Sequence, residues 1–471
     1  MIDFSETEKQ YITILYLHER SLTPMKLAII FPPLPFGWTP VAPPILEYLA
    51  ALTRREDPSI DIEVYSASAT PDVFDNLDCD LAAISLLTPT SVGGYTIAAK
   101  LRARGAKVVF GGIHASLMPD EAIQHGDAVV SGEAEDAWPQ VLRDFKAGAL
   151  KKFYQAERLQ LDDLPTPLYG MLKHGHQFRV VNTSRGCPYN CTFCSVKPFM
   201  GADIRFRPID HVVRDVAAIP EKMYINGDEN IWWQGFEQRA IDMFTALKGS
   251  GKKWMGFGSL RPVLTPAGSR MLNAARESGM LTVWVGWDAI SDDALTAYRA
   301  NGKIGVDRER AVKTLRDHGI DVSLFYMLGG RNDSLDDFKR SVELADRLGV
   351  SMHPSLLVPY PGTELRRQYE PYLYKDLGWE FYSGAYALFE HPDPRMTAEA
   401  REEAFYESSL EILSTWRILS HMRHVPLSGF PYAHILSLMN QLPVRKGMKI
   451  AYEKWKAEKG VVRRKQLLGE I

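Results

Sequence analysis

The stretch Asn182-Thr-Ser-Arg-Gly-Cys187-Pro-Tyr-Asn-Cys191-Thr-Phe-Cys194-Ser195 contains three of the four cysteines in a chain of 471 residues. Its gaps of four and three residues would line the thiols along one face of a helix. Gly186, Pro188 and Asn190, however, disfavour a regular helix across this stretch. We therefore predict a loop that presents three thiols.

Three thiolates on one loop suit an iron–sulfur cluster. A cubane cluster usually takes four cysteine ligands, so a set of three leaves one iron open to bind another molecule. Structural zinc is the alternative, but zinc usually recruits four ligands as two spaced pairs. No second Cys/His pair stands at a matching distance. The iron–sulfur hypothesis is therefore favoured.

The segment Cys187-Pro-Tyr-Asn-Cys191-Thr-Phe-Cys194 resembles the CxxxCxφC motif of radical S-adenosylmethionine (SAM) enzymes, including the aromatic Phe193. The resemblance implies a [4Fe-4S] cluster held by Cys187, Cys191 and Cys194, whose open iron binds the amino and carboxylate groups of SAM. An electron from a flavodoxin or ferredoxin would reduce the cluster, which would cleave SAM to a 5′-deoxyadenosyl radical.

Buried-strand patterns alternate with helical ones on both sides of this loop, which predicts an α/β protein. Upstream, the pattern predicts a doubly wound, Rossmann-like parallel sheet with strands at residues 25–31, 60–65, 81–87, 107–110 and 128–130. Downstream, six strand candidates predict a partial (β/α)6 barrel, with strands at residues 178–182, 222–226, 254–258, 281–286, 321–328 and 352–358. A barrel of this kind is also what the resemblance implies.

The last hundred residues lack this alternation and indicate helices at 397–422 and 432–448. Their frequent aromatic residues either pack a core, which is the favoured interpretation, or line a pocket for a large apolar substrate. The predicted organisation is an N-terminal extension (1–24), a first domain (25–150), a linker (151–177), a barrel core (178–375) and a helical C-terminal domain (376–471).

Two segments at predicted strand ends of the first domain, Gly111-Gly112-Ile113-His114-Ala115 and Val130-Ser131-Gly132-Glu133-Ala134-Glu135, resemble cobalamin-binding domains. The chain lacks the D-x-H-x-x-G sequence of domains that ligate cobalt through histidine, so both a cobalamin-binding and a vestigial domain stay open. For His114, a loop histidine satisfied by backbone groups is an equal alternative. The resemblance implies cobalamin contacts at Ser85, Thr88, Gly111, Gly112, His114, Gly132 and Glu133.

Barrel enzymes collect their functional groups at the carboxyl ends of the strands. Asn226-Gly-Asp-Glu-Asn230 stands where the family carries its Gly-Gly-Glu-like motif, and Asp288 stands where a glutamate is expected on the ribose hydroxyls. Helix caps for the aspartates and structural ion pairs for the arginines are the alternatives. The resemblance implies SAM contacts at Gly227, Asp228, Ser259, Asp288, Pro361, Arg205 and Arg207.

Composition points to an ordinary globular protein, with 45% hydrophobic and 24% charged residues. The net charge of −3 suggests neither nucleic acid nor an anionic membrane as a partner, although local patches are not excluded by it. Few cysteines and reactive thiols fit a reducing, cytoplasmic compartment. No segment reads as a transmembrane helix or targeting peptide.

The order of these parts resembles the cobalamin-domain radical SAM family, which includes methylases and the bacteriochlorophyll ring cyclase. The leading hypothesis is a methyltransferase that uses the radical for cobalamin-dependent methylation of an unactivated carbon in a small-molecule substrate. The first alternative is a cobalamin-free radical cyclisation or rearrangement with a vestigial first domain. A non-catalytic metal-binding scaffold is the remote alternative.

Overall fold

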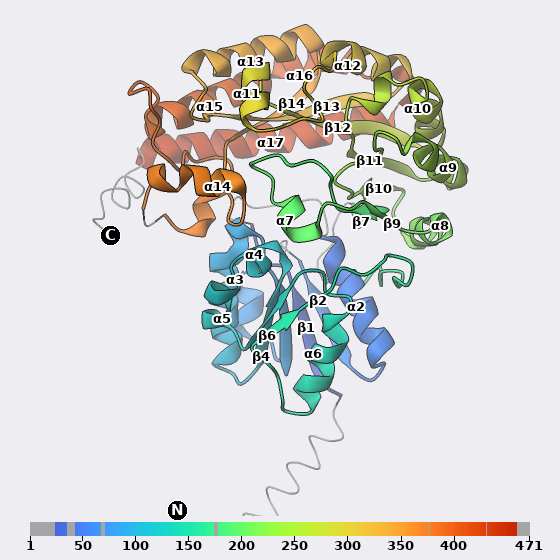
Figure 1. Ribbon diagram of the computed structural model, residues 1–471, viewed down its shortest axis with the longest axis vertical. Helices are drawn as coiled ribbons and strands as arrows, with labels where there is room; N and C mark the ends of the chain where they lie inside the picture. Colours follow the sequence, from blue (N-terminus) through green and yellow to red (C-terminus); the bar gives the residue numbers. More distant parts are fainter. Residues whose placement is uncertain are drawn as a thin grey trace, which may run out of the picture.

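The computed structural model describes residues 24–34, 43–66, 71–173, 178–375, 377–429 and 431–458. The extension predicted for residues 1–24 lies outside the described residues, apart from Pro24. Two six-stranded parallel sheets dominate the chain, and Figure 1 shows the first sheet below the second. Both sheets and the helical C-terminal region were predicted from the sequence, and the fold class is confirmed.

The first sheet has the order β2-β1-β3-β4-β5-β6. Its strands are β1 (Lys26–Ile30), β2 (Asp61–Tyr65), β3 (Leu81–Ser85), β4 (Lys107–Gly111), β5 (Ala128–Ser131) and β6 (Phe153–Gln155). The chain reverses its direction of winding between β1 and β3, so a ligand crevice is expected at their carboxyl ends. The sequence did not predict β6, which lies within the segment expected to be a linker.

Both faces of the first sheet are covered, which explains its continuously apolar strands. One face packs against α2 (Pro44–Glu56) and α6 (Ala137–Lys146), where Trp138 is buried and donates to Thr53. The other face packs against α3 (Ser91–Arg102) and α5 (Pro119–His125). Figure 1 shows these two pairs of helices on opposite sides of the sheet.

The second sheet has the order β14-β13-β12-β11-β10-β7, the winding of a partial barrel. Its strands are β7 (Arg179–Val181), β10 (Met223–Asn226), β11 (Lys253–Phe257), β12 (Met280–Asp288), β13 (Asp321–Leu328) and β14 (Ser351–Leu356). Its outer face packs against α8 (Ile209–Ala218), α9 (Glu237–Leu247), α10 (Gly268–Glu277), α12 (Arg308–Asp317) and α13 (Leu335–Leu348).

The single helix predicted for residues 397–422 is wrong. The structure has α15 (Ala398–Ile412) and α16 (Thr415–Met422), separated at Ser414, whose ψ of 148° is extended and interrupts the helical backbone. The helix predicted for 432–448 is confirmed as α17 (Tyr432–Glu458), which continues further and contains Pro443. Within the described part of the chain, no helix is both long and apolar enough to cross a membrane.

Candidate active site between the two sheets

The cysteine loop is the closed end of a short antiparallel ribbon. Strands β8 (Ser184–Arg185) and β9 (Arg205–Phe206) pair, and the loop between them carries the three cysteines and α7 (Val196–Met200). Residues 186–195 form no regular helix, so the predicted cysteine loop is confirmed. Gly186 has a φ of +94°, and a Cβ there would lie 2.0 Å from the Asp203 carbonyl oxygen. Only glycine fits at this closing position.

Gly186→Ala is expected to destabilise the protein by about 1–3 kcal/mol, because alanine is strained at positive φ. It should also lower the iron content after reconstitution, since the new methyl group must displace the Asp203 backbone. The control is Gly235→Ala, which has the same backbone strain (φ +84°) but no atom within 4 Å of the added Cβ. Equal iron contents in the two variants would contradict this account of the loop.

The three thiols are partly accessible, and the loop that carries them is held from both sides. The Thr192 backbone N–H donates to the Tyr298 carbonyl over 2.9 Å, and the Thr192 carbonyl accepts from Leu365 N–H over 2.8 Å. Burial raises the pKa of the Cys191 thiol to about 11 and that of the Cys194 thiol to about 12. Metal binding at this loop therefore releases protons.

Among the described residues, no group of three or more His, Cys, Asp or Glu side chains converges on a single metal ion. In a cubane, each thiolate binds a different iron, so the sulfur atoms stay apart. The donor chemistry of the loop thus fits an iron–sulfur cluster.

Asp228 holds the cysteine loop to the second sheet. Its carboxylate accepts from the Thr183 N–H (2.6 Å), the Ser184 hydroxyl (2.9 Å) and the Thr183 hydroxyl. The side chain is buried, and these partners are Thr183 in the turn between β7 and β8 and Ser184 at the start of β8. Asp228 therefore faces this turn.

Glu229 and Gly227 face the space beside the loop instead. Much of the Glu229 side chain is exposed to that space, yet its depth in the molecule raises its pKa to about 7, with the Asp228 carboxylate contributing. Sequence reasoning did not single out Glu229. Its neighbour Asp228 was chosen, and the turn after β10 decides which of the two side chains reaches the cavity.

Asp288 ends β12 in the left-handed region, with a φ of +60°. Its carboxylate is paired with Lys303, and the Lys303 charge opposes the upward shift in the pKa of Cys191. Arg261 positions this lysine, because its guanidinium donates to the Ile304 carbonyl over 2.7 Å. Lys303 is a further candidate that sequence reasoning missed, since it lies in a loop with no motif.

Two other predicted residues lie at strand ends without lining the cavity. The Ser259 N–H donates to Asn230 over 2.9 Å, and the Ser259 hydroxyl accepts from the same side chain. Pro361 is buried in the loop between β14 and α14 (Glu364–Tyr369). In that loop Gly362 lies against the first domain, where an added Cβ would be 2.7 Å from Leu117.

The two predicted arginines have different partners. Arg205 is buried and ion-paired with Glu133 of the first domain, which also pairs with Arg185 over 2.6 Å. Arg207 pairs with Asp215 over 2.6 Å and lines the cavity. Two of the Arg207 N–H groups, at Nε and Nη2, are buried without a hydrogen-bond partner among the described residues. Such orphaned donors suit a polar group of a ligand.

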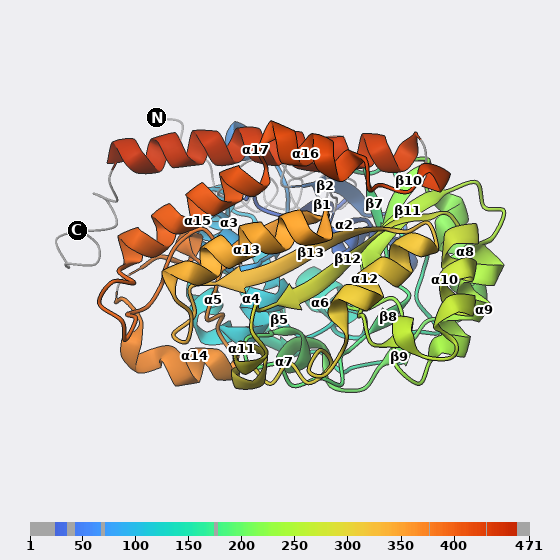
Figure 2. The same cartoon turned by 90° about the horizontal axis from the view of Figure 1, so that it is seen from above.

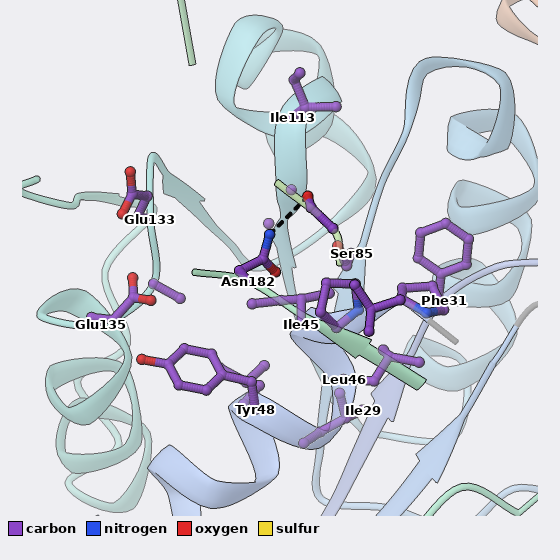
Figure 3. A pocket seen from close by; sticks show the side chains of 18 of the residues that line it. Ile29, Phe31, Ile45, Leu46, Tyr48, Ser85, Ile113, Glu133, Glu135 and Asn182 are labelled. Atoms are coloured by element: carbon purple, nitrogen blue, oxygen red, sulfur yellow. Dashed lines mark hydrogen bonds between the residues drawn. The ribbon is translucent and has the colours of Figure 1, made fainter. Parts of the chain in front are cut away.

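A cavity of about 550 Å³ lies between the domains, at the carboxyl ends of β1, β3, β4, β5, β7 and β10. Figure 3 shows its mainly apolar wall, with Ile45 and Tyr48 from α2, Ile113 above them, and Glu133 and Glu135 at one side. The Asn182 amide closes another side and donates to the Gly227 carbonyl over 2.8 Å. The cavity therefore lies between the first domain and the second six-stranded sheet, at the strand ends near the cysteine loop.

The structure divides the predicted cobalamin contacts into two groups. Thr88 and His114 are buried away from the cavity, where His114 lies 3.3 Å from the Thr88 hydroxyl and 3.2 Å from the Tyr95 hydroxyl. No histidine is among the described residues that line the cavity. The other predicted contacts do line it, namely Ser85, Gly111, Gly112, Gly132 and Glu133.

Comparison with protein families gives two matches along the chain. The model of the radical SAM superfamily matches residues 181–345, and the model of the B12 binding domain matches residues 40–142. The chain is a radical SAM protein with an N-terminal B12-binding domain. Its cofactors are a [4Fe-4S] cluster, SAM and cobalamin. The predictions of the cluster and of SAM are confirmed, and the question of cobalamin, which the sequence left open, is decided in its favour.

This radical SAM protein is similar to bacteriochlorophyllide d C-12(1)-methyltransferase of Chlorobaculum tepidum, with 24% identity over 76% of this chain and 80% of that protein. It is also similar to the anaerobic magnesium-protoporphyrin IX monomethyl ester cyclase of Cereibacter sphaeroides, with 23% identity over 63% of this chain and 55% of that protein. Its fold is similar to that of the cobalamin-dependent radical enzyme OxsB, with a TM-score of 0.63, 14% identity, and coverage of 97% and 82%.

The cavity of the radical SAM protein fits a large ligand that approaches the backbone of the first domain. At Gly112 (φ +85°) an added Cβ would lie 2.8 Å from the backbone of Leu86, and at Gly132 (φ +96°) it would lie 3.2 Å from the Ala156 carbonyl oxygen. An added side chain at either position would run into the neighbouring backbone, so these two turns at the cavity require glycine. No histidine is among the described lining residues that would contact cobalamin held here.

Proposed function

We propose that this radical SAM protein is a C-methyltransferase that adds a methyl group to an unactivated carbon of a small-molecule substrate. The observation that carries the proposal is the single cavity that joins the B12-binding strand ends to the strand ends beside the cysteine loop. When bound, the cluster and SAM supply a 5′-deoxyadenosyl radical for hydrogen abstraction, and cobalamin supplies the methyl group. Both reactions need to occur in one enclosed space.

The lining residues would keep water from a reactive carbon and orient polar ligand groups. Most of the wall is apolar, as in the side chains of Phe31, Leu87 and Val109. The unpartnered N–H groups of Arg207 would bind an amide or carboxylate of a ligand. Gly112 and Gly132 line the cavity and would let a broad molecule contact the backbone at the strand ends.

We assign SAM binding to residues around the cysteine loop, of which Gly227 and Glu229 line the cavity. The Glu229 carboxylate would accept from the SAM ammonium group, and Gly227 would offer its backbone. Asp288 and Lys303 form an ion pair near Cys191 that would bind the ribose hydroxyls or the SAM carboxylate. Asp228 would act indirectly, because it holds the loop through Thr183 and Ser184.

Glu229→Gln is expected to weaken SAM binding by about 10- to 100-fold, because a hydrogen bond to a charged partner contributes about 1.5–3 kcal/mol. The iron content should stay at the wild-type level, since Glu229 is not a cluster ligand. Equilibrium dialysis of labelled SAM against the reconstituted protein measures the effect. Glu277→Gln is the matched control, because its side chain is exposed and lies on an outer helix. Unchanged SAM affinity in Glu229→Gln would contradict the assignment.

A test of methyl transfer needs no knowledge of the substrate. The protein purified from cobalamin-fed cells is expected to contain corrin and protein in equal amounts. Incubation with SAM labelled in its methyl group, together with a reductant, should then transfer label to the corrin fraction. A corrin-free protein that still releases 5′-deoxyadenosine at full rate would overturn the proposal.

That second outcome would favour a radical cyclisation or rearrangement, as the similarity to the cyclase suggests. The electron donor in either case would be a flavodoxin or ferredoxin, and the oxygen-labile cofactor favours a cytoplasmic setting. A large, apolar substrate is supported by the apolar wall of the cavity. The aromatic residues of the C-terminal region support it less, since Tyr382 and Phe389 are buried in a cluster packed around Cys191 and Phe193.

A further inference from the structure

The outer side of α17 carries an apolar stripe that no described part of the chain covers. Its members follow each other at helical spacing, three or four residues apart over the first three turns, so they share one side of the helix. The exposed fractions are 51% for Ile435, 40% for Met439, 46% for Leu442 and 62% for Ile450. Exposed fractions of this size are unusual for several aliphatic side chains that share one face of a helix.

The opposite side of α17 is anchored to the protein. Ala433 and Leu436 are buried against Ile225 of β10 and other strand residues. The Gln441 side chain donates to His421 of α16 over 3.1 Å, and both side chains are buried. The helix is therefore fixed in orientation, and its apolar stripe points away from the rest of the chain.

Helix α16 extends the apolar surface. Trp416 is 66% exposed and Leu419 is 53% exposed, three residues further along the same helix. The Arg423 guanidinium lies over the Trp416 ring, 5.5 Å from its centroid. Figure 2 shows α16 and α17 together along one outer edge of the molecule. Tryptophan and arginine on an apolar surface are typical of a membrane–water interface.

The charge of this region differs in sign from that of the whole chain. Residues 415–458 contain seven Lys or Arg and two acidic residues, Glu453 and Glu458, whereas the chain has a net charge of −3. Lys446 and Lys449 are exposed on the same side of α17 as the apolar stripe, because Lys446 lies four residues after Leu442 and four before Ile450. After α17 the sequence continues with Lys459, Arg463, Arg464 and Lys465. A helix face that is apolar in its first half and carries cations in its second half matches an anionic lipid surface.

We propose that α16 and α17 bind the surface of a membrane that contains anionic phospholipids, with the helix axes lying in the plane of the interface. The apolar stripe would enter the boundary between headgroups and acyl chains, while the bordering lysines would contact lipid phosphates. A protein partner for the same face would need a strongly acidic surface. This inference does not depend on the proposed methyl transfer and concerns a surface that lies outside the cavity.

The test is co-sedimentation of the full chain with vesicles of phosphatidylcholine alone and of equal parts phosphatidylcholine and phosphatidylglycerol. Wild-type protein is expected to sediment with the mixed vesicles and to remain largely in solution with phosphatidylcholine alone. High salt should release it, because the lysine–phosphate attraction is screened. Equal binding to both vesicle types, or to neither, would overturn the proposal.

Two variants locate the binding surface. The double change Ile435→Glu and Leu442→Glu should abolish sedimentation, whereas Phe153→Glu, an exposed aromatic on the first sheet, should leave it unchanged. The double change Lys446→Glu and Lys449→Glu should weaken partitioning at least about twenty-fold. Its charge-matched control is Lys313→Glu and Lys339→Glu, both on outer helices and both exposed.

Thermal unfolding of each variant tests whether the fold is retained. Substitutions at these exposed positions are expected to leave the unfolding temperature close to that of the wild type. Light scattering distinguishes lipid binding from self-association. A dimer that dissociates in Ile435→Glu and Leu442→Glu, without vesicle binding by the wild type, would assign the stripe to a second copy of the chain and reject the membrane.

Discussion

Cys191→Ala is expected to leave the reconstituted protein without an intact [4Fe-4S] cluster and to lower 5′-deoxyadenosine release by at least about 10³-fold, the size of loss typical of removing an essential group. The cubane would keep two protein thiolates, and neither Cys187 nor Cys194 can replace the missing one because the loop is pinned at Thr192. Iron and sulfide content, absorbance and electron paramagnetic resonance of the reduced protein measure the effect.

Cys79→Ala is the matched control, since Cys79 is the remaining cysteine of the chain and belongs to the first domain. Its side chain packs at the edge of the core cluster under α3, and burial raises the pKa of its thiol to about 12. Iron content and SAM cleavage should equal those of the wild type. A Cys191→Ala protein that cleaved SAM at the wild-type rate would remove the cysteine loop from the mechanism.

Glu133→Ala is expected to destabilise the protein by about 3–5 kcal/mol, because it leaves the buried guanidinium group of Arg205 without a counter-charge, whereas Arg185 keeps Glu135 over 2.7 Å. Both arginines belong to the ribbon that closes the cysteine loop. The variant should therefore lose thermal stability, become sensitive to protease between the domains, and bind less iron. Differential scanning calorimetry and limited proteolysis measure these changes.

The control for Glu133→Ala is Glu277→Ala, which removes the exposed partner of Lys248 and should cost less than about 1 kcal/mol. The variant Glu133→Gln separates charge from packing, since glutamine preserves the size of the side chain. If Glu133→Ala unfolded at the wild-type temperature, the ion pairs between the domains would have no role in holding the cysteine ribbon.

The strand positions could be predicted from the sequence because parallel strands buried on both faces are continuously apolar, as in Lys107–Gly111 and Asp321–Leu328. The two-residue strands β8 and β9 could not, since they contain Ser184, Arg185 and Arg205 and depend on distant partners. The break at Ser414 was missed for a similar reason, because one extended residue leaves the helical periodicity on both sides unchanged.

The candidate site was predicted at the level of segments and only partly at the level of side chains. The motifs point to the turn after β10 and to the end of β12, but they do not show that Asp228 faces the β7–β8 turn while Glu229 faces the cavity. Lys303 was missed because its contact with Asp288 joins residues in different elements. Ion pairs of this kind follow from tertiary packing, which a linear pattern does not contain.

The anchoring of the cysteine loop has a consequence for the order of assembly. Its ribbon pairs with Glu133 of the first domain, and its middle bonds to Leu365 at the start of α14, almost at the end of the barrel. The loop therefore reaches its final shape only after both domains have been synthesised and have docked. Iron–sulfur insertion is then a late step of maturation, and a barrel expressed without the first domain would offer an unfinished site to the insertion machinery.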